Sequence, residues 1–363
     1  MAKYRGLEKP LELNWRGLID NILRKSTPKR PYHMELFHDG EIGKALVEKF
    51  DLTKGLKKDD PHFERRVGLA INRFCGFDYA CVGIAGSALQ LHWQSTEDTA
   101  EMKRAGGRGF IDEHTGPITN WEQFEKYPWP QFDTPVAHEA LDWYNKNTPE
   151  DMCLIAFTGH FAEEVTWLMG YETLCYALFE QRDLVQAIAD KLMDHYRRAM
   201  KMFAQYDRIK MTWATDDMGY KTGLMISPDD TRQFVLKNHK ELARMSHEMG
   251  RPYLLHSCGK LHDVIDDLID DVKIDAKHSW EDTIEDVRDA KKTYGKRIGL
   301  LGAIDVDFLC RADEAAIRKR VRDTLDACLP GGGFCLGTGN SVANYVPVEN
   351  YLAMIDEGRL YGM

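Results

Sequence analysis

Short apolar segments alternate with longer amphipathic segments along most of the chain. Short segments with near-continuous apolar character are typical of parallel strands that are buried on both faces. The amphipathic segments repeat apolar residues every three or four positions, which indicates helices that cover a sheet. The pattern predicts eight strands, at residues 32–37, 79–83, 152–157, 210–213, 253–256, 274–278, 298–301 and 333–336.

The clearest predicted helix begins at Ser227 and ends near Gly250. Serine is a good cap, Pro228 suits the first helical position, and the acidic Asp229 and Asp230 favour the positive end of the helix dipole. Glycine is the common residue just past a helix end. The other predicted helices span residues 41–50, 171–180, 184–205, 261–269, 283–293, 313–328 and 347–358.

Eight strands that alternate with helices predict a single (β/α)8 TIM-barrel domain of the α/β class over residues 1–363. A doubly wound open sheet is the alternative, because it has the same order of elements. Residues 84–151 are too long for one connection. We interpret them as an insertion after the second strand that forms a lid over the barrel mouth, with a small hairpin. Residues 1–30 are expected to form an N-terminal helical extension outside the barrel.

Composition and charge narrow the classes of function. Apolar residues make up 43% of the chain and charged residues 29%, as in ordinary globular proteins. The net charge of −10 argues against nucleic-acid binding, which needs a basic surface. No apolar run is long enough to span a membrane, and residues 1–29 lack the apolar core of a signal peptide, so we expect a cytoplasmic location. The eight cysteines are then free thiols or metal ligands.

Three candidate metal ligands lie on two of the predicted strands, whose carboxyl ends face the active site in a barrel. His256 ends its strand, and Cys258 follows two positions later, on the same side of an extended segment. Cys335 lies in the strand 333–336, across the barrel mouth. Imidazole and thiolate are ligands that zinc prefers. The alternative for each residue alone is an ordinary buried position.

The same residues carry a resemblance to a known family. The segment His256-Ser257-Cys258-Gly259, with Cys335 77 positions after Cys258, resembles the His-x-Cys…Cys zinc motif of corrinoid-linked methyltransferases, which are relatives of uroporphyrinogen decarboxylase. The resemblance covers most of the chain from about residue 152 to residue 358, and it implies a TIM barrel. Other segments that resemble this superfamily are Asp216-Asp217-Met218-Gly219 with Ile226-Ser227-Pro228, then Gly302-Ala303-Ile304-Asp305, and Phe334-Cys335-Leu336-Gly337-Thr338-Gly339.

The chain departs from the decarboxylases at two places. They carry an Arg-Gln-Ala-Gly-Arg segment after the first strand, where this chain has Met34-Glu35-Leu36-Phe37-His38-Asp39-Gly40 without an arginine. Their late Gly-His-Gly is Gly339-Asn340-Ser341 here. A tetrapyrrole with eight carboxylates needs cationic groups in its pocket, so we do not expect decarboxylation of uroporphyrinogen.

The resemblance implies a zinc-dependent methyltransferase. Its cobalamin would be carried by a partner corrinoid protein, because no part of this chain resembles a cobalamin-binding domain. The methyl group would pass to a thiol such as coenzyme M, or would come from a methoxylated aromatic ether in O-demethylation. Zinc suits either direction, because it turns a thiol into a thiolate and polarises an ether oxygen. The alternatives are a binder of tetrapyrrole-like molecules and a barrel whose zinc is structural.

Further polar residues follow the predicted strands. Glu281 is the candidate fourth zinc ligand, since its position resembles that of the glutamate ligand in cobalamin-independent methionine synthase; the alternatives are a helix cap at Glu281 and ligation by His278. The candidate catalytic residues are Asp217 and His160, at the ends of the fourth and third strands. Asp217 would orient His256 or contact the substrate, and the alternative is a loop cap. The candidate substrate-binding residues are Glu35, His38, Asp216, His278 and Asn340.

Overall fold

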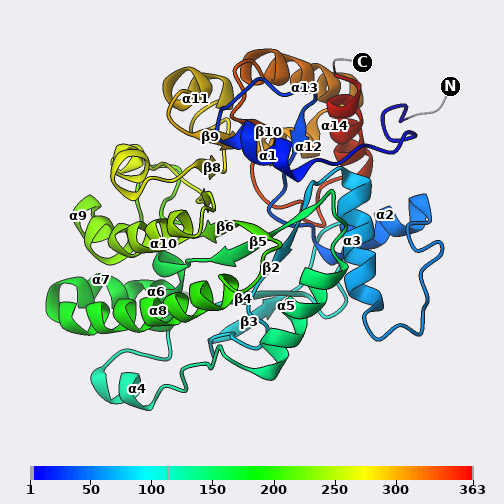
Figure 1. Cartoon of the computed structure of the whole chain (residues 1–363). Coiled ribbons are helices and arrows are strands. Elements are labelled where there is room, and N and C mark those ends of the chain that lie inside the picture. Colours follow the sequence, from blue (N-terminus) through cyan, green and yellow to red (C-terminus); the bar gives the residue numbers. More distant parts are fainter. Residues whose placement is uncertain (1–3, 113, 362–363) are drawn as a thin grey trace.

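The computed structural model describes residues 4–112 and 114–361. Its centre is a curled sheet of eight parallel strands surrounded by helices (Figure 1). Every predicted strand is present. The strands are β1 (Tyr32–His33), β2 (Tyr79–Val82), β5 (Cys153–Thr158), β6 (Ile209–Thr215), β7 (Tyr253–His256), β8 (Ala276–His278), β9 (Gly299–Leu301) and β10 (Phe334–Leu336).

The order of the strands is that of a barrel. Neighbours in the sheet run β1-β10-β9-β8-β7-β6-β5-β2, so the first strand pairs with the last. A doubly wound sheet would leave these two strands apart. The TIM-barrel prediction is therefore confirmed, and the open-sheet alternative is wrong.

Strands β1 and β2 do not pair with each other, which leaves a seam in the barrel wall. The side chain of Tyr79 bridges this seam. Its hydroxyl accepts the backbone N–H of Glu35 at 2.9 Å and donates to the carbonyl of Glu35 at 2.7 Å. The strand predicted at residues 32–37 consequently ends at His33, because Glu35 bonds to a side chain and not to a neighbouring strand.

Helices cover the outside of the sheet, and the predicted helix at residues 227–250 has three parts. Its cap is as expected, since the hydroxyl of Ser227 accepts the N–H of Asp230 at 3.1 Å. The three parts are α9 (Pro228–Asp230), a π-helical turn (Thr231–Leu236) and α10 (Lys237–Glu248). The other covering elements are α2 (Gly40–Phe50), α3 (Phe63–Cys75), α6 (Phe161–Met169), α7 (Tyr171–Glu180), α8 (Arg182–Phe203), a π-helical turn (Asp267–Val272), α11 (Val287–Tyr294), α12 (Val306–Arg311), α13 (Glu314–Cys328) and α14 (Val348–Leu360).

The N-terminal extension contributes one helix within residues 4–30, α1 (Trp15–Ile22), where several were expected. It lies at the amino-terminal end of the barrel. The side-chain amide of Asn21 donates to the carbonyl of Phe334 at 2.8 Å, and the N–H of Gly333 donates to the carbonyl of Asn21 at 2.7 Å. These bonds seal the base of the barrel, opposite the mouth.

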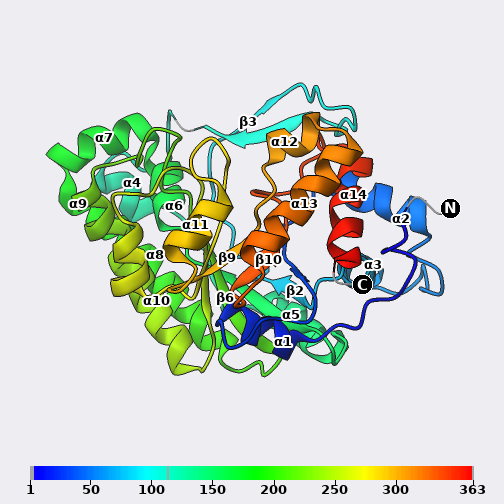
Figure 2. The same ribbon diagram turned by 90° about the horizontal axis from the view of Figure 1, so that it is seen from above.

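The inserted residues after β2 hold the expected hairpin, with β3 (Trp93–Thr96) antiparallel to β4 (Arg108–Ile111). Two helices follow, α4 (Trp121–Lys126) and α5 (Pro135–Asn147). In the view from above, the hairpin lies at the edge of the molecule, at the top of the picture (Figure 2). The insertion is tied to the mouth loops, because Arg104 pairs with Asp39 at 3.1 Å and Asn344 donates to Asp98 at 2.6 Å.

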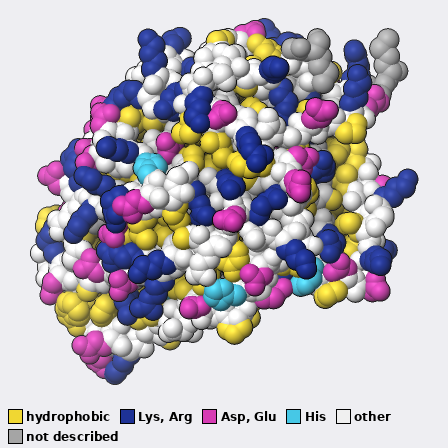
Figure 3. Space-filling model, in the orientation of Figure 1, with side chains coloured by type: hydrophobic (Ala, Val, Ile, Leu, Met, Phe, Trp, Pro, Cys, Tyr) yellow, Lys and Arg dark blue, Asp and Glu magenta, His cyan; other side chains and the backbone are white. Residues whose placement is uncertain are grey.

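The surface carries charges of both signs close together. On the face shown in Figure 3, Lys and Arg alternate with Asp and Glu around small apolar areas. In the described part of the chain, no helix has both the length and the apolar character that a membrane span needs.

Candidate metal centre at the barrel mouth

Three neighbouring strands end in register at the barrel mouth. Thr215, the last residue of β6, is level with His256 of β7, which is level with His278 of β8. Asp217 and Cys258 each follow two positions after the level shared by Thr215 and His256. Parallel strands therefore deliver a carboxylate, an imidazole and a thiol to the same place.

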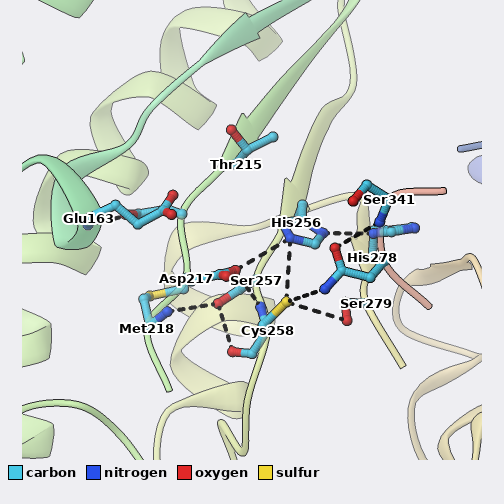
Figure 4. Close-up of polar contacts among 12 residues, drawn as sticks. Glu163, Thr215, Asp217, Met218, His256, Ser257, Cys258, His278, Ser279 and Ser341 are labelled. Carbon is cyan, nitrogen blue, oxygen red and sulfur yellow. Dashed lines mark hydrogen bonds and ion pairs between the residues drawn. The ribbon is translucent and has the colours of Figure 1, made fainter. Parts of the chain in front are cut away.

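Asp217, His256 and Cys258 form a compact group whose ligand atoms all lie within 4.8 Å of one another (Figure 4). Nε2 of His256 is 3.3 Å from Oδ1 of Asp217 and 3.6 Å from Sγ of Cys258. Ligands at about 2.0 Å and 2.3 Å around a tetrahedral zinc would lie about 3.3 to 3.5 Å apart. The three groups fit three corners of a zinc site and leave the fourth corner for another ligand.

A chain of hydrogen bonds fixes the imidazole of His256. Nε2 of His278 lies 3.1 Å from the carbonyl of Thr338, which can only accept, so this nitrogen carries the proton. Burial, together with the neighbouring His256 and Lys277, lowers the pKa of His278 well below its ordinary value, so its ring is neutral. Its Nδ1 therefore accepts from Nδ1 of His256 at 2.7 Å. This arrangement turns the lone pair of Nε2 on His256 toward Asp217 and Cys258.

The charges and lone pairs of Asp217, His256 and Cys258 would suit a bound cation. Burial opposes ionisation of Asp217, but hydrogen bonds from His256 and from the N–H of Cys258 outweigh it and hold the carboxyl pKa at about 2. Burial and the carboxylate of Asp217 raise the pKa of the Cys258 thiol. A divalent ion bound here would replace the proton of the Cys258 thiol.

Cys335, predicted as a ligand, does not join this group. It is fully buried within β10, before the end of the strand. The side-chain amide of Asn21 in α1 lies 3.4 Å from its sulfur, so the thiol faces the base of the barrel. The residue that reaches the group from the loop after β10 is Asn340, whose amide donates to Sγ of Cys258 at 3.3 Å.

The other predicted mouth residues have distinct surroundings. Glu281 lies outside the three-residue group, half-buried in the loop after β8, and lines a mouth cavity of about 1020 Å³ together with Asn340. Burial and the nearby Asp305 raise its pKa. Both oxygens of Asp216 are occupied, because they accept the first N–H groups of α6 and one of them also meets Nε2 of His239 at 2.7 Å. Asp216 thus caps a helix.

His160 lies at the start of α6, 2.8 Å from the hydroxyl of Thr215 and 3.4 Å from the carboxylate of Glu163. Burial acts to lower the pKa of His160, but the hydrogen bond to Glu163 and the nearby carboxylates outweigh it and raise the pKa. His160 is therefore a candidate proton carrier on the β5 and β6 side of the mouth, where Thr215 and Glu163 lie in the same view as Asp217 (Figure 4).

Glu35 and His38 lie on the opposite side, after β1. The carboxylate of Glu35 accepts the N–H of Thr338 at 3.0 Å and its hydroxyl at 2.6 Å. Burial outweighs these bonds and raises the pKa of Glu35 to about 8. Burial lowers the pKa of His38 to about 4, and its Nε2 lies 2.8 Å from the hydroxyl of Tyr351. Both side chains are neutral at pH 7.

Replacing Glu35 should change how stability depends on pH. The folded protein keeps the Glu35 proton up to about pH 8, whereas an exposed carboxyl loses it near pH 4.5. Glu35 therefore contributes a fall in the free energy of unfolding of about 1.4 kcal/mol per pH unit across this window, and its contribution is level above it. We expect Glu35→Gln to remove this slope, as measured by urea denaturation at pH 6 and pH 9. Glu64→Gln, at an exposed carboxyl, is the control, and an unchanged slope in Glu35→Gln would contradict the expectation.

Sequence reasoning missed two residues of the site. Thr338 contacts both Glu35 and His278; its place in the segment Phe334–Gly339 was the signal that could have identified it. Lys277 is buried and donates to the carbonyls of Ser279 at 2.7 Å and Ser257 at 3.2 Å, which flank the candidate ligands. Burial lowers its pKa to about 8. The presence of a lysine inside an apolar strand was the signal that could have identified Lys277.

Comparisons with known proteins agree with the fold and give the family. Residues 105–361 match the uroporphyrinogen decarboxylase (URO-D) family. The methylcobamide:CoM methyltransferase MtaA of Methanosarcina barkeri is 28% identical over 131 residues, which are 36% of this chain and 36% of that protein. The match thus spans little more than a third of that relative. The structure of a methyltransferase from Methanosarcina mazei has a TM-score of 0.66 and 14% identity, and covers 95% of this chain and 98% of that one.

Proposed function

The chain belongs to the uroporphyrinogen decarboxylase family, and on that premise we propose that it is a methyltransferase, which moves a methyl group between a corrinoid carried by a partner protein and a small substrate. The observation that carries the proposal is the convergence of Asp217, His256 and Cys258 at the barrel mouth. The partial similarity to a methylcobamide:CoM methyltransferase supports it. The small substrate is a thiol acceptor such as coenzyme M or a methoxylated aromatic donor.

We propose that this group holds zinc. A zinc ion there would supply either a thiolate at neutral pH or polarisation of an ether oxygen. His278 and Thr338 keep the ring of His256 in the ligating tautomer. Asn340 donates to the sulfur of Cys258 and so stabilises its negative charge. Glu281 remains the candidate for the fourth position, in competition with the substrate.

In the demethylation direction, the leaving phenolate needs a proton. His160 is the candidate donor, since its pKa is raised and it faces the mouth beside Thr215. In the thiol direction, the same imidazole would take the proton that the thiol releases. The corrinoid would come from a partner, because the barrel interior is filled by side chains such as Trp213 and leaves no room for a macrocycle.

The test is a methyl-transfer assay with zinc-loaded protein. We expect transfer between a methyl-loaded or reduced corrinoid protein and at least one member of a panel of thiols and methoxylated aromatics, followed by the cobalamin spectrum. Asp217→Ala should lower the rate by at least about tenfold, because the metal site loses a charged ligand. No transfer with any combination of carrier and substrate would refute the methyltransferase proposal.

Uroporphyrinogen is the informative negative control for the same preparation. The segment after β1 carries Glu35, His38 and Asp39 but no arginine for the substrate carboxylates. Incubation should therefore release no coproporphyrinogen, and efficient decarboxylation would favour the tetrapyrrole alternative. Free methylcobalamin is the second control: if it reacts as well as every carrier-bound form, the partner is unnecessary.

A further inference from the structure

A cavity of about 620 Å³ lies beside the seam at which β1 and β2 fail to pair. The strand side of the cavity includes Glu35, Tyr79 and Cys81, and helices α2 and α3 form its outer wall. These two helices stand together on one side of the barrel (Figures 1 and 2). Its apolar lining includes Leu36, Val47, Val67, Ile71, Phe77 and Phe157. A volume of this size suits a small organic molecule.

Gly68 of α3 leaves space for the cavity, whereas Gly43 of α2 lies close to Ile71, which a Cβ at that position would meet at 3.3 Å. Gly43 lies within α2 and Gly68 within α3, and both line the cavity. A Cβ atom added to Gly68 would meet no atom within 4 Å, so the space beside it is empty. Glycine inside a helix costs about 1 kcal/mol relative to alanine. Helix α3 thus carries a stability cost at a position where a side chain would fill the cavity.

The polar groups deep in the cavity carry no charge at neutral pH. Glu35 is 2% exposed and keeps its proton, and His38 is a neutral imidazole. Among the charged groups that line the cavity, Asp39 is engaged with Arg104, the side chain of Lys44 is 77% exposed, and Glu64 is exposed. A buried anion would find no cation among the described residues deep in this cavity, whereas a hydroxyl could donate to the neutral carboxyl of Glu35.

The cavity and the candidate metal centre share a residue. Thr338 donates its N–H to Glu35, its hydroxyl lies 2.6 Å from Glu35 and 2.5 Å from the carbonyl of Asn340, and its carbonyl accepts from His278. His278 in turn accepts from His256. A single residue, Thr338, therefore connects the polar end of the cavity with the residue that orients a candidate metal ligand.

We propose that this cavity binds a neutral molecule with a single substituted aromatic ring, whose oxygen bonds to the carboxyl of Glu35. This inference rests on the proposed methyltransferase function and names its substrate class as an uncharged methoxylated arene, in preference to an anionic thiol. Apolar side chains of both helices would hold the ring beside the seam.

The site is tested with 4-bromophenol, a neutral single-ring probe, and 4-bromobenzoate, its anionic counterpart. Crystals of the full chain soaked in each are examined for anomalous scattering from bromine, and affinities are measured by calorimetry. We expect bromine density in the cavity with the phenol and at least tenfold weaker binding of the benzoate. Bromine found only elsewhere, or equal affinity for the two probes, would overturn the proposal.

Two variants of one residue control for folding. Gly68→Leu fills the cavity, and Gly68→Ala gives α3 a similar gain in helix propensity with little volume. Both should melt at or above the temperature of the parent protein, whereas only Gly68→Leu should weaken 4-bromophenol binding, by at least tenfold. Equal binding to both variants would contradict the site.

If the phenol binds in the cavity but no methyl transfer occurs, the cavity stands and the proposed function fails. If a methoxylated arene donates its methyl group without binding in the cavity, the proposed function stands and the cavity proposal fails.

Discussion

Cys258→Ser is expected to abolish tight zinc binding, while Cys335→Ser leaves it intact. The sulfur of Cys258 lies 3.6 Å from Nε2 of His256 in the candidate centre, so its loss removes one of three converging ligands. A serine hydroxyl is a poor replacement for a thiolate, and we expect a fall in affinity of at least about a hundredfold. Cys335 faces Asn21 at the base of the barrel, and its substitution removes no ligand.

The measurement is metal content after dialysis against a weak chelator, with circular dichroism to show that both variants are folded. Cobalt(II) gives an independent reading, because the intensity of its sulfur charge-transfer band follows the number of thiolate ligands. One thiolate is expected in the parent protein and in Cys335→Ser. A two-thiolate spectrum, or equal zinc loss in both serine variants, would restore Cys335 to the site and contradict the structure.

The sequence motif misplaced Cys335 because spacing along a chain does not specify depth in a barrel. The ligand candidates of the structure lie at or beyond the last residue of their strands, as His256 and Cys258 do. Cys335 precedes the end of its strand and is paired with Tyr32 near the base. Asp217 carried a usable signal, because it follows Thr215 by the same two positions that separate Cys258 from His256. Asp217 and Cys258 lie at the same level because Thr215 and His256 are paired in the sheet, and this strand register cannot be read from the sequence alone.

The strands themselves were predictable, since segments buried on both faces must be apolar throughout. The seam between β1 and β2 was not, because it depends on which strands meet in three dimensions. The apolar run at residues 32–37 has the composition of a strand, yet the hydroxyl of Tyr79 takes the backbone bonds of Glu35. The cavity beside the seam was hidden for the same reason. Glu35 and His38 were marked as substrate residues, but their neutrality is a consequence of burial.

His278→Leu is expected to weaken zinc binding by tenfold to about a hundredfold without removing any ligand. In the parent protein, Nδ1 of His278 accepts the proton on Nδ1 of His256 at 2.7 Å, which leaves Nε2 free to bind the metal. Leucine leaves that proton unpaired in a buried site, so His256 gains freedom to rotate or to move its proton to Nε2.

His278→Asn is the matched control, because its side-chain oxygen occupies the place of Nδ1 and still accepts. Zinc affinity is measured by competition with a chromophoric chelator, and the tautomer of His256 by nitrogen-15 spectra of histidine-labelled protein. The affinity of the Leu variant should fall far below that of the Asn variant, with the Nδ1 proton of His256 retained in the Asn variant. If both variants bind zinc equally well, the hydrogen-bond chain through Thr338 has no part in preparing the metal site.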